Sequence, residues 1–217
     1  MTIVACGGAI RNLVGYLLGL TGKEDPAVCV LPTATGDASV PLFYELFSSD
    51  RCRPSHVALF GIPRPDWREH ILSRDLVFVG GGNTASMLGV WRAHGVDVVL
   101  REAWERGVVL AGNSAGAICW FEAGVTDSFR KELDALDCLG WLSGSCCPHY
   151  DGEPNRRPAY ERLLDEGFPA GIAIDDHAAA RFDGTQLAEV VAGLEGAGAY
   201  RVDRDGELPL PVRSVWN

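Results

Sequence analysis

Five short and almost continuously apolar runs constrain the fold of this 217-residue chain more than any other feature of its sequence. The runs are residues 2–6, 27–31, 56–60, 76–79 and 108–111. Turns with glycine or proline and helix-forming stretches lie between them, and the stretches are residues 11–20, 41–49, 85–94 and 97–106. Strands without polar alternation are covered on both faces, which is typical of parallel sheets. The pattern therefore predicts a doubly wound α/β fold, a mostly parallel sheet with helices on both faces.

The last third of the chain has a different pattern. Its expected strands are short, and they are residues 171–174, 178–182, 186–191, 200–202 and 207–210. Asp-Gly pairs at 183–184 and 205–206 separate two pairs of these strands and are typical of hairpin turns. We therefore expect antiparallel hairpins that extend one edge of the sheet. No repeat, low-complexity tract or linker divides the chain, which predicts a single α/β domain over residues 1–217.

Composition narrows the class of protein. A formal net charge of −10 argues against bulk binding to nucleic acid or to an anionic membrane. No apolar run approaches the ~18 residues of a membrane span, and the first residues lack the basic segment of a signal peptide. A hydrophobic content of 47% excludes a largely disordered chain. We therefore expect a cytoplasmic protein, a monomer or homodimer, with no nucleic-acid or membrane partner.

The cysteines favour a reducing compartment. There are seven of them, an odd number, and no two form a Cys-x-x-Cys pair. Disulfide scaffolds are short with even counts, and structural zinc sites repeat tight spacings. Neither pattern fits, so most of these residues are predicted to be buried core thiols.

A candidate nucleophile lies between an expected strand and a helix. Residues 112–116 read Gly-Asn-Ser-Ala-Gly, and Gly-x-Ser-x-Gly in this setting is typical of a sharp turn that lifts the serine oxygen off the sheet. The two glycines remove Cβ atoms that would clash with the adjacent strand and helix. The helix N-terminus favours negative charge at the same point. Ser114 is therefore the candidate nucleophile, and the alternative is a helix N-cap behind a flexible turn.

A second glycine turn, Gly-Gly-Gly-Asn-Thr at 80–84, also follows an expected strand. Acyl transfer needs two N–H donors where negative charge develops. The natural pair is the N–H of Ala115 with that of Gly81 or Gly82. The alternative is a turn required only for packing of helix on sheet. A phosphate-binding loop is the weaker interpretation, because the stretch lacks a Gly-Lys-Ser/Thr ending and a Gly-x-Gly-x-x-Gly pattern.

A serine nucleophile needs a general base, and the chain has five histidines. His149 is the best placed, since it ends an apolar run and precedes a Tyr-Asp-Gly turn. Asp175 and Asp176 follow the run 171–174 and offer the carboxylate that fixes its tautomer. His177 remains the fallback base.

Three ordered motifs carry a resemblance to a known family. Gly-Gly-Gly-Asn-Thr at 80–84, Gly-Asn-Ser-Ala-Gly-Ala at 112–117 and Pro-His-Tyr at 148–150 together resemble the peptidase E family of serine peptidases. That family includes aspartyl dipeptidases and, more distantly, cyanophycinases. The resemblance implies a class I glutamine amidotransferase-like fold with serine in place of the amidotransferase cysteine. It also implies the chain order Ser–His–acid.

The resemblance implies roles for single residues. Ser114 is then the nucleophile and His149 the base. The family's third member is typically Glu, and the matching position here is Asp176, one methylene shorter, with Asp175 the next choice.

The resemblance also implies substrate contacts. Asn83, in the first motif, is expected to contact substrate. An arginine shortly after Pro-His-Tyr holds the acidic side chain of the substrate in family aspartyl dipeptidases, and Arg156 aligns best with it. The alternative for Arg156 and Arg157 is a solvated pair before a helix. Because the chain is acidic overall, attraction of an acidic substrate requires a local basic residue.

The function implied is that of a serine peptidase acting on small peptides, above all dipeptides with an N-terminal Asp, without a metal or organic cofactor. One alternative is a cyanophycinase-like or isoaspartyl peptide hydrolase of the same family. A second is an amidotransferase, which Ser114 argues against. A third is a non-catalytic small-molecule binding protein with the same fold.

Overall fold

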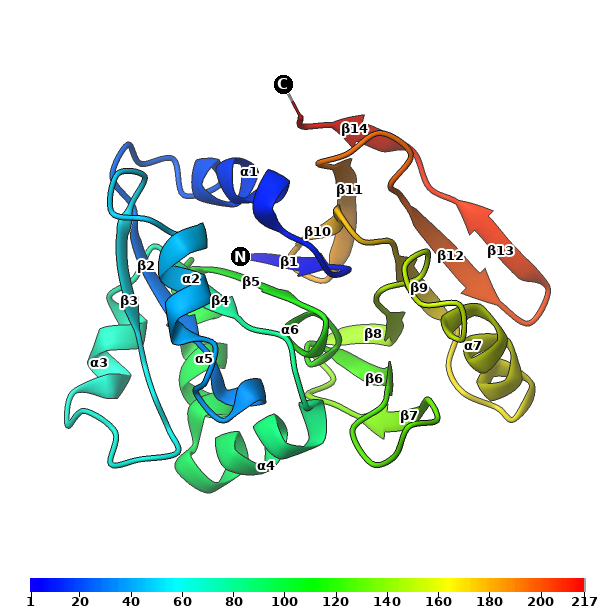
Figure 1. Ribbon diagram of the computed structural model, residues 1–217, viewed down its shortest axis with the longest axis horizontal. Coiled ribbons are helices and arrows are strands. Elements are labelled where there is room, and N and C mark those ends of the chain that lie inside the picture. The colour runs from blue at the N-terminus through cyan, green and yellow to red at the C-terminus, as the bar shows by residue number, and fades with distance from the viewer. Residues whose placement is uncertain (217) are drawn as a thin grey trace.

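The structure, a computed structural model, describes residues 1–216 and contains two β-sheets flanked by helices (Figure 1). The helices are η1 (Arg11–Leu13), α1 (Val14–Gly19), η2 (Thr33–Thr35), α2 (Val40–Leu46), α3 (Trp67–Leu72), α4 (Thr84–His94), α5 (Val96–Glu105), α6 (Ala115–Ile118) and α7 (Arg156–Asp165). The larger sheet contains β1 (Thr2–Cys6), β2 (Ala27–Leu31), β3 (Arg53–His56), β4 (Leu76–Val79), β5 (Val109–Asn113), β10 (Ala178–Asp183), β11 (Gln186–Ala192) and β14 (Val212–Ser214). The smaller sheet contains β6 (Phe121–Thr126), β7 (Asp134–Asp137), β8 (Leu142–Cys147), β9 (Gly171–Ile174), β12 (Ala199–Asp203) and β13 (Gly206–Pro209).

The larger sheet has the strand order β14-β11-β10-β1-β5-β4-β2-β3. The pairs from β1 through β5, β4 and β2 to β3 are all parallel. Beyond β1, the hairpin of β10 and β11 adds two antiparallel pairs. The expected mostly parallel sheet with an antiparallel C-terminal extension is therefore confirmed.

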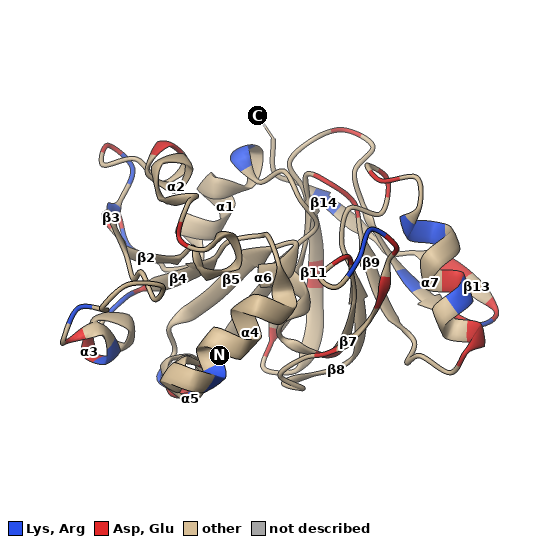
Figure 2. Ribbon diagram, turned by 60° about the horizontal axis from the view of Figure 1, so that its bottom comes forward, with Lys and Arg blue, Asp and Glu red and all other residues tan. Residues whose placement is uncertain are grey.

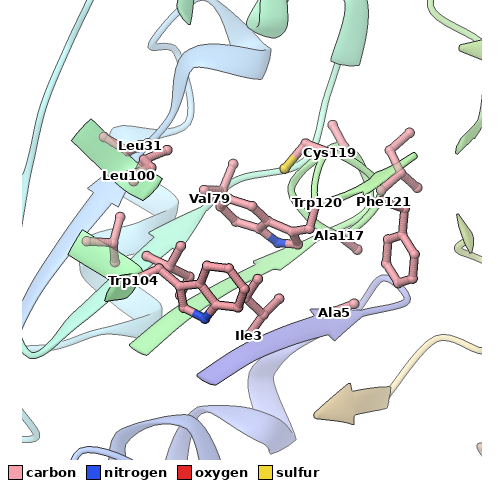
Figure 3. Close-up of a cluster of buried hydrophobic side chains, with 14 of the residues drawn as sticks. Ile3, Ala5, Leu31, Val79, Leu100, Trp104, Ala117, Cys119, Trp120 and Phe121 are labelled. Carbon is pink, nitrogen blue, oxygen red and sulfur yellow. The ribbon is translucent and has the colours of Figure 1, made fainter. Parts of the chain in front are cut away.

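Helices cover both faces of this sheet because successive strand residues point to opposite sides. In β4, Val77 and Val79 join a buried cluster with side chains of α3, α4, α5 and α6, part of which Figure 3 shows around Trp104 and Trp120. Leu76 and Phe78 belong to a second cluster beneath α1 and α2. Each fully buried aliphatic or aromatic side chain contributes about 1.5–3 kcal/mol. The predicted doubly wound arrangement follows from this two-sided burial.

One expected strand lies earlier than predicted. We expected residues 56–60, but β3 ends at His56 and pairs in parallel with β2. Pro54 is tolerated there because an edge strand has one side without a ladder partner. Val57 and Leu59 are buried in the loop after the strand, so their hydrophobicity reflects core packing rather than strand structure.

The smaller sheet was not predicted as a separate sheet. Its strands β6, β7 and β8 lie in a region for which we expected no strands, and β9, β12 and β13 join them. The hairpin at 205–206 therefore extends this sheet instead of the larger one. Strands such as β7, Asp-Ala-Leu-Asp, are short and partly polar, so they carry little periodic signal.

The two sheets direct their strand ends toward a common region. Parallel neighbours β1, β5 and β4 end side by side, as do β8 and β9 of the smaller sheet. The loop after β1 touches the end of β9, because a Cβ on Gly7 would lie 2.0 Å from the Asp175 carbonyl oxygen. Ligands of open α/β sheets bind at such carboxyl ends.

The helices of the structure are short. No helix within residues 1–216 is long and apolar enough to cross a membrane.

The seven cysteines are free thiols, and all except Cys138 are buried. Burial raises the pKa of Cys6 to about 12, and that of Cys147 likewise, so these thiols stay protonated. The prediction of buried core thiols is confirmed.

Candidate active site

Ser114 lies in a sharp turn between β5 and α6. Its backbone has φ 53° and ψ −113°, a conformation that non-glycine residues rarely adopt. Its N–H donates to the Cys6 carbonyl oxygen at 3.2 Å, and its own carbonyl accepts from the N–H groups of Ala117 and Ile118. The turn is thus held between β1 and the first turn of α6, with Ser114 at its tip.

The two glycines of the motif permit close packing at this turn. A Cβ on Gly112 would lie 2.3 Å from the Gly116 carbonyl oxygen. A Cβ on Gly116 would lie 2.2 Å from the Val79 carbonyl oxygen of β4. Neither contact is compatible with a side chain, so the spacing of the motif follows from backbone packing.

His149 and Asp176 form a hydrogen-bonded pair. The loop after β8 carries His149 and the loop after β9 carries Asp176, and His149 Nδ1 lies 2.8 Å from Asp176 Oδ1. The side chains are 21% and 29% exposed, so both reach the surface of the site. The Asp176 N–H donates to Asp151 Oδ1 at 2.8 Å, which fixes the loop. Nδ1 of the neutral ring then carries the proton, which leaves Nε2 as the basic nitrogen.

Asp175 lies elsewhere. It is 1% exposed, and its Oδ2 accepts from the Gly198 N–H at 2.9 Å and from the Tyr200 hydroxyl. Burial, followed by the nearby Asp151, raises the pKa of Asp175 from 3.8 to about 6. His177, the fallback base, has a buried Nδ1 without a partner among residues 1–216 and does not line the cleft with Ser114.

Gly8 is a site residue that the sequence analysis missed. A Cβ at this position would lie 1.7 Å from Asp176 Oδ1 and 2.5 Å from His149 Nδ1. The backbone after β1 therefore packs directly against the pair and leaves no room for a side chain. The available signal was the pair Gly7-Gly8 at the end of the first expected strand.

Ser114 and His149 line one cleft of about 520 Å³. Its lining residues are Gly8, Ala9, Ile10, Arg11, Thr35, Ser39, Leu42, Phe43, Leu46, Gly81, Gly82, Asn113, Ser114 and His149. Figure 2 shows charged segments on the outer helices α3, α5 and α7, whereas α6, directly after Ser114, carries none. The volume lies in the range that small ligands occupy.

Two N–H groups near Ser114 are candidates for binding an oxyanion. Among residues 1–216, the N–H of Ala115 and the N–H of Gly82 donate to no protein acceptor. The Gly81 N–H instead donates to Asn113 Oδ1 at 3.2 Å. Of the two glycines that the sequence left open, Gly82 therefore has the available donor.

Asn83 and Arg156 do not line the cleft. Asn83 caps α4, since its Oδ1 accepts from the Ser86 N–H and its Nδ2 donates to the Ser128 carbonyl, both at 2.8 Å. Arg156 is 3% exposed, so it is no solvated residue. Its Nε donates to Glu153 Oε2 at 2.7 Å and its guanidinium also donates to the Val125 carbonyl. These placements favour structural roles for both residues.

A metal site requires several ligand side chains that converge on one point. Within 1–216, no group of three or more His, Cys, Asp or Glu side chains is arranged to hold a metal ion.

Ser114 on a strand–turn–helix elbow and His149, which is hydrogen-bonded to Asp176, line the same cleft, and this is the residue set from which a serine hydrolase site can be built. The family model of peptidase family S51 matches residues 4–190. The chain therefore belongs to peptidase family S51, the peptidase E family, and its class is that of a peptidase.

Relatives agree with this assignment. The chain is 48% identical over 209 residues to the uncharacterized peptidase YgaJ of Bacillus subtilis (strain 168), covering 93% of this chain and 90% of that protein. Among solved structures, a peptidase from an acI-B1 Actinobacterium matches with a TM-score of 0.74 at 20% identity, over 97% of this chain and 94% of that one. A putative peptidase E protein from Listeria monocytogenes EGD-e matches with a TM-score of 0.68 at 18% identity, over 86% and 96%. At these identities the two structures support the fold, and the expected resemblance is confirmed.

Proposed function

We propose that this peptidase is a serine peptidase that hydrolyses small peptides, with dipeptides bearing an N-terminal Asp as preferred substrates. The observation that carries the proposal is the His149–Asp176 hydrogen bond of 2.8 Å, made by a histidine that lines the same cleft as Ser114. The preference for Asp rests on the family resemblance. The order Ser–His–acid along the chain agrees with that resemblance.

The first chemical step follows from the tautomer of His149. With Nδ1–H held by Asp176, Nε2 accepts the hydroxyl proton of Ser114 as Oγ attacks the scissile carbonyl. Asp176 stabilises the imidazolium that results, because an opposite charge favours the protonated ring. His149 then returns the proton to the leaving amine, and an acyl-enzyme on Ser114 remains.

Negative charge on the tetrahedral intermediate is stabilised by backbone donors. The free N–H groups of Ala115 and Gly82 supply the two hydrogen bonds that this step requires. The strained elbow at Ser114 supports this role, since it exposes Oγ next to the N–H of the following residue. Water activated by His149 resolves the acyl-enzyme.

Catalysis by this triad is tested with a variant of the nucleophile and with Asp→Asn variants of the two adjacent aspartates. Ser114→Ala is expected to reduce turnover of Asp-Leu by about 10⁶-fold. Asp176→Asn removes the carboxylate that orients His149 and is expected to lower kcat by about 10³–10⁴-fold. The matched control is Asp175→Asn, whose carboxyl is buried against Gly198, and it is expected to change kcat less than tenfold.

Turnover is measured by release of the C-terminal amino acid from α- and β-aspartyl dipeptides. Faster cleavage of the α-linked peptide is expected, and faster cleavage of the β-linked one contradicts the proposed substrate. Wild-type rates in Ser114→Ala, or equal losses in the two aspartate variants, contradict the mechanism.

A further inference from the structure

Among the described residues, one cation and no carboxylate line the cleft that holds Ser114 and His149. The cation is Arg11, the first residue of η1. In a chain with 29 acidic residues and a net charge of −10, a purely basic lining is a local exception. Arg11 therefore supplies the local positive charge that an acidic protein needs if it is to attract an acidic substrate.

The guanidinium of Arg11 is not used by the protein. Arg11 is exposed, and it forms no ion pair or side-chain hydrogen bond with any residue in the range 1–216. Arg156 differs, because both Glu153 and the Val125 carbonyl occupy its donors. The donors of Arg11 are therefore free to bind a ligand.

The backbone of Arg11 is nevertheless fixed relative to the reacting groups. Its neighbours Ile10 and Leu13 are 5% and 0% exposed and anchor η1 in the core. Three residues earlier, Gly8 packs against His149, and the Gly8 carbonyl accepts from Asn113 Nδ2 at 3.3 Å. The segment that carries Arg11 is thus connected to both sides of the site, to the base and to the residue before Ser114.

The surroundings strengthen an ion pair at this place. Leu42, Phe43 and Leu46 of α2 form an apolar wall of the same cleft. Apolar walls lower the local dielectric and so increase the attraction between opposite charges. A guanidinium can also bind both oxygens of a carboxylate at once.

We propose that Arg11 is the specificity residue of this site and binds a carboxylate of the peptide substrate, an inference that rests on the proposed peptidase function. The carboxylate is either the acidic side chain of the N-terminal residue or the free C-terminus of the peptide. Both groups present the same chemistry to a guanidinium, and substrate variants separate them.

The test compares kcat/KM of wild type, Arg11→Gln and Arg11→Lys on Asp-Leu, Asn-Leu and Asp-Leu-amide. Arg11→Gln is expected to lower kcat/KM for Asp-Leu by about 10–100-fold, and Arg11→Lys to recover part of the loss. A loss that spares only Asn-Leu assigns the side chain, and a loss that spares only Asp-Leu-amide assigns the C-terminus. The matched control is Arg92→Gln, an exposed arginine of α4 outside the cleft, for which no change is expected.

Equal losses on all three peptides, or no loss on any, overturn the role of Arg11. If wild type cleaves none of the three, the proposed function fails, and binding still decides the role of Arg11. Calorimetry then compares Asp-Leu binding to Ser114→Ala and to Ser114→Ala/Arg11→Gln. Binding weaker by at least tenfold in the double variant supports the proposal, whereas an unchanged Kd, or no binding to Ser114→Ala, overturns it. Unchanged thermal unfolding of Arg11→Gln shows that the exposed substitution leaves the fold intact.

Discussion

At the scale of the residue, the conformation of Ser114 links folding to chemistry. A φ of 53° with ψ of −113° is unfavourable for any residue with a Cβ. Each residue in such a conformation lowers the stability of the folded state by about 1–3 kcal/mol. The surrounding structure imposes it through the Cys6 carbonyl on one side and α6 on the other. The turn thereby places Ser114 in the wall of the cleft that His149 also lines.

Relief of this strain is therefore measurable. Ser114→Gly is expected to raise the free energy of unfolding by about 1 kcal/mol, because glycine adopts this conformation freely, although its larger unfolded-state entropy offsets part of the gain. Urea denaturation measures the change, and turnover is lost at the same time. The control Ser143→Gly, in β8, is expected to lower stability by about 1 kcal/mol, as glycine does in strands. A loss of stability in Ser114→Gly contradicts the strain.

At the scale of the element, Arg156 holds the start of α7 against β6. It is the first residue of the helix, it is buried, and it donates to the Val125 carbonyl of β6 across the smaller sheet. Glu153 neutralises its charge from the preceding turn. A residue seven positions after His149 thus serves the packing of α7 against β6.

Arg156→Met keeps the apolar stem and removes the charge. It is expected to lower the free energy of unfolding by about 2 kcal/mol, because the Val125 carbonyl loses a buried donor. The control Arg162→Met, on the same helix, removes an exposed ion pair with Glu166 and a part-buried hydrogen bond to the Leu133 carbonyl, and it is expected to cost less, about 1 kcal/mol. Chemical denaturation measures both variants. A loss of activity confined to acidic peptides would instead return Arg156 to substrate recognition.

At the scale of the whole molecule, the two sheets meet where the three residues of the proposed triad lie. Ser114 follows a strand of the larger sheet, whereas His149 and Asp176 follow strands of the smaller one. Asp175, between β9 and β10, connects the sheets in sequence and is buried at their junction with a pKa of about 6. Global stability is therefore linked to the ionisation of this carboxyl.

The sign of this linkage follows from the direction of the shift. Folded Asp175 binds its proton more tightly than the unfolded residue, so its contribution to stability declines as pH rises from about 4 to about 6. Asp175→Asn removes that decline. Above pH 6 the variant is expected to gain up to about 3 kcal/mol over wild type, and near pH 4 much less. Urea unfolding between pH 4 and pH 8 measures the difference, and a difference that is constant with pH contradicts it.

The main sheet and the turn at Ser114 could be predicted because their signals are local. Continuous apolar runs such as 76–79 require cover on both faces, and the glycines at 112 and 116 have no room for side chains. The smaller sheet gave no such signal, since strands like β7 are short and partly polar. The role of Gly8 could not be predicted from the sequence, because it depends on two loops more than 140 residues away, which carry His149 and Asp176.

The sequence by itself determined the α/β class and the elbow at Ser114, because spacing along the chain dictates strand, turn and helix, and it offered His149 as the candidate base. Tertiary structure alone decided which of two adjacent aspartates reaches that histidine, with Asp176 turned to it and Asp175 turned to Gly198. It also decided which arginine faces the cleft, Arg11 instead of Arg156. Burial and pairing depend on what packs against a side chain, and elements distant in sequence supply those neighbours.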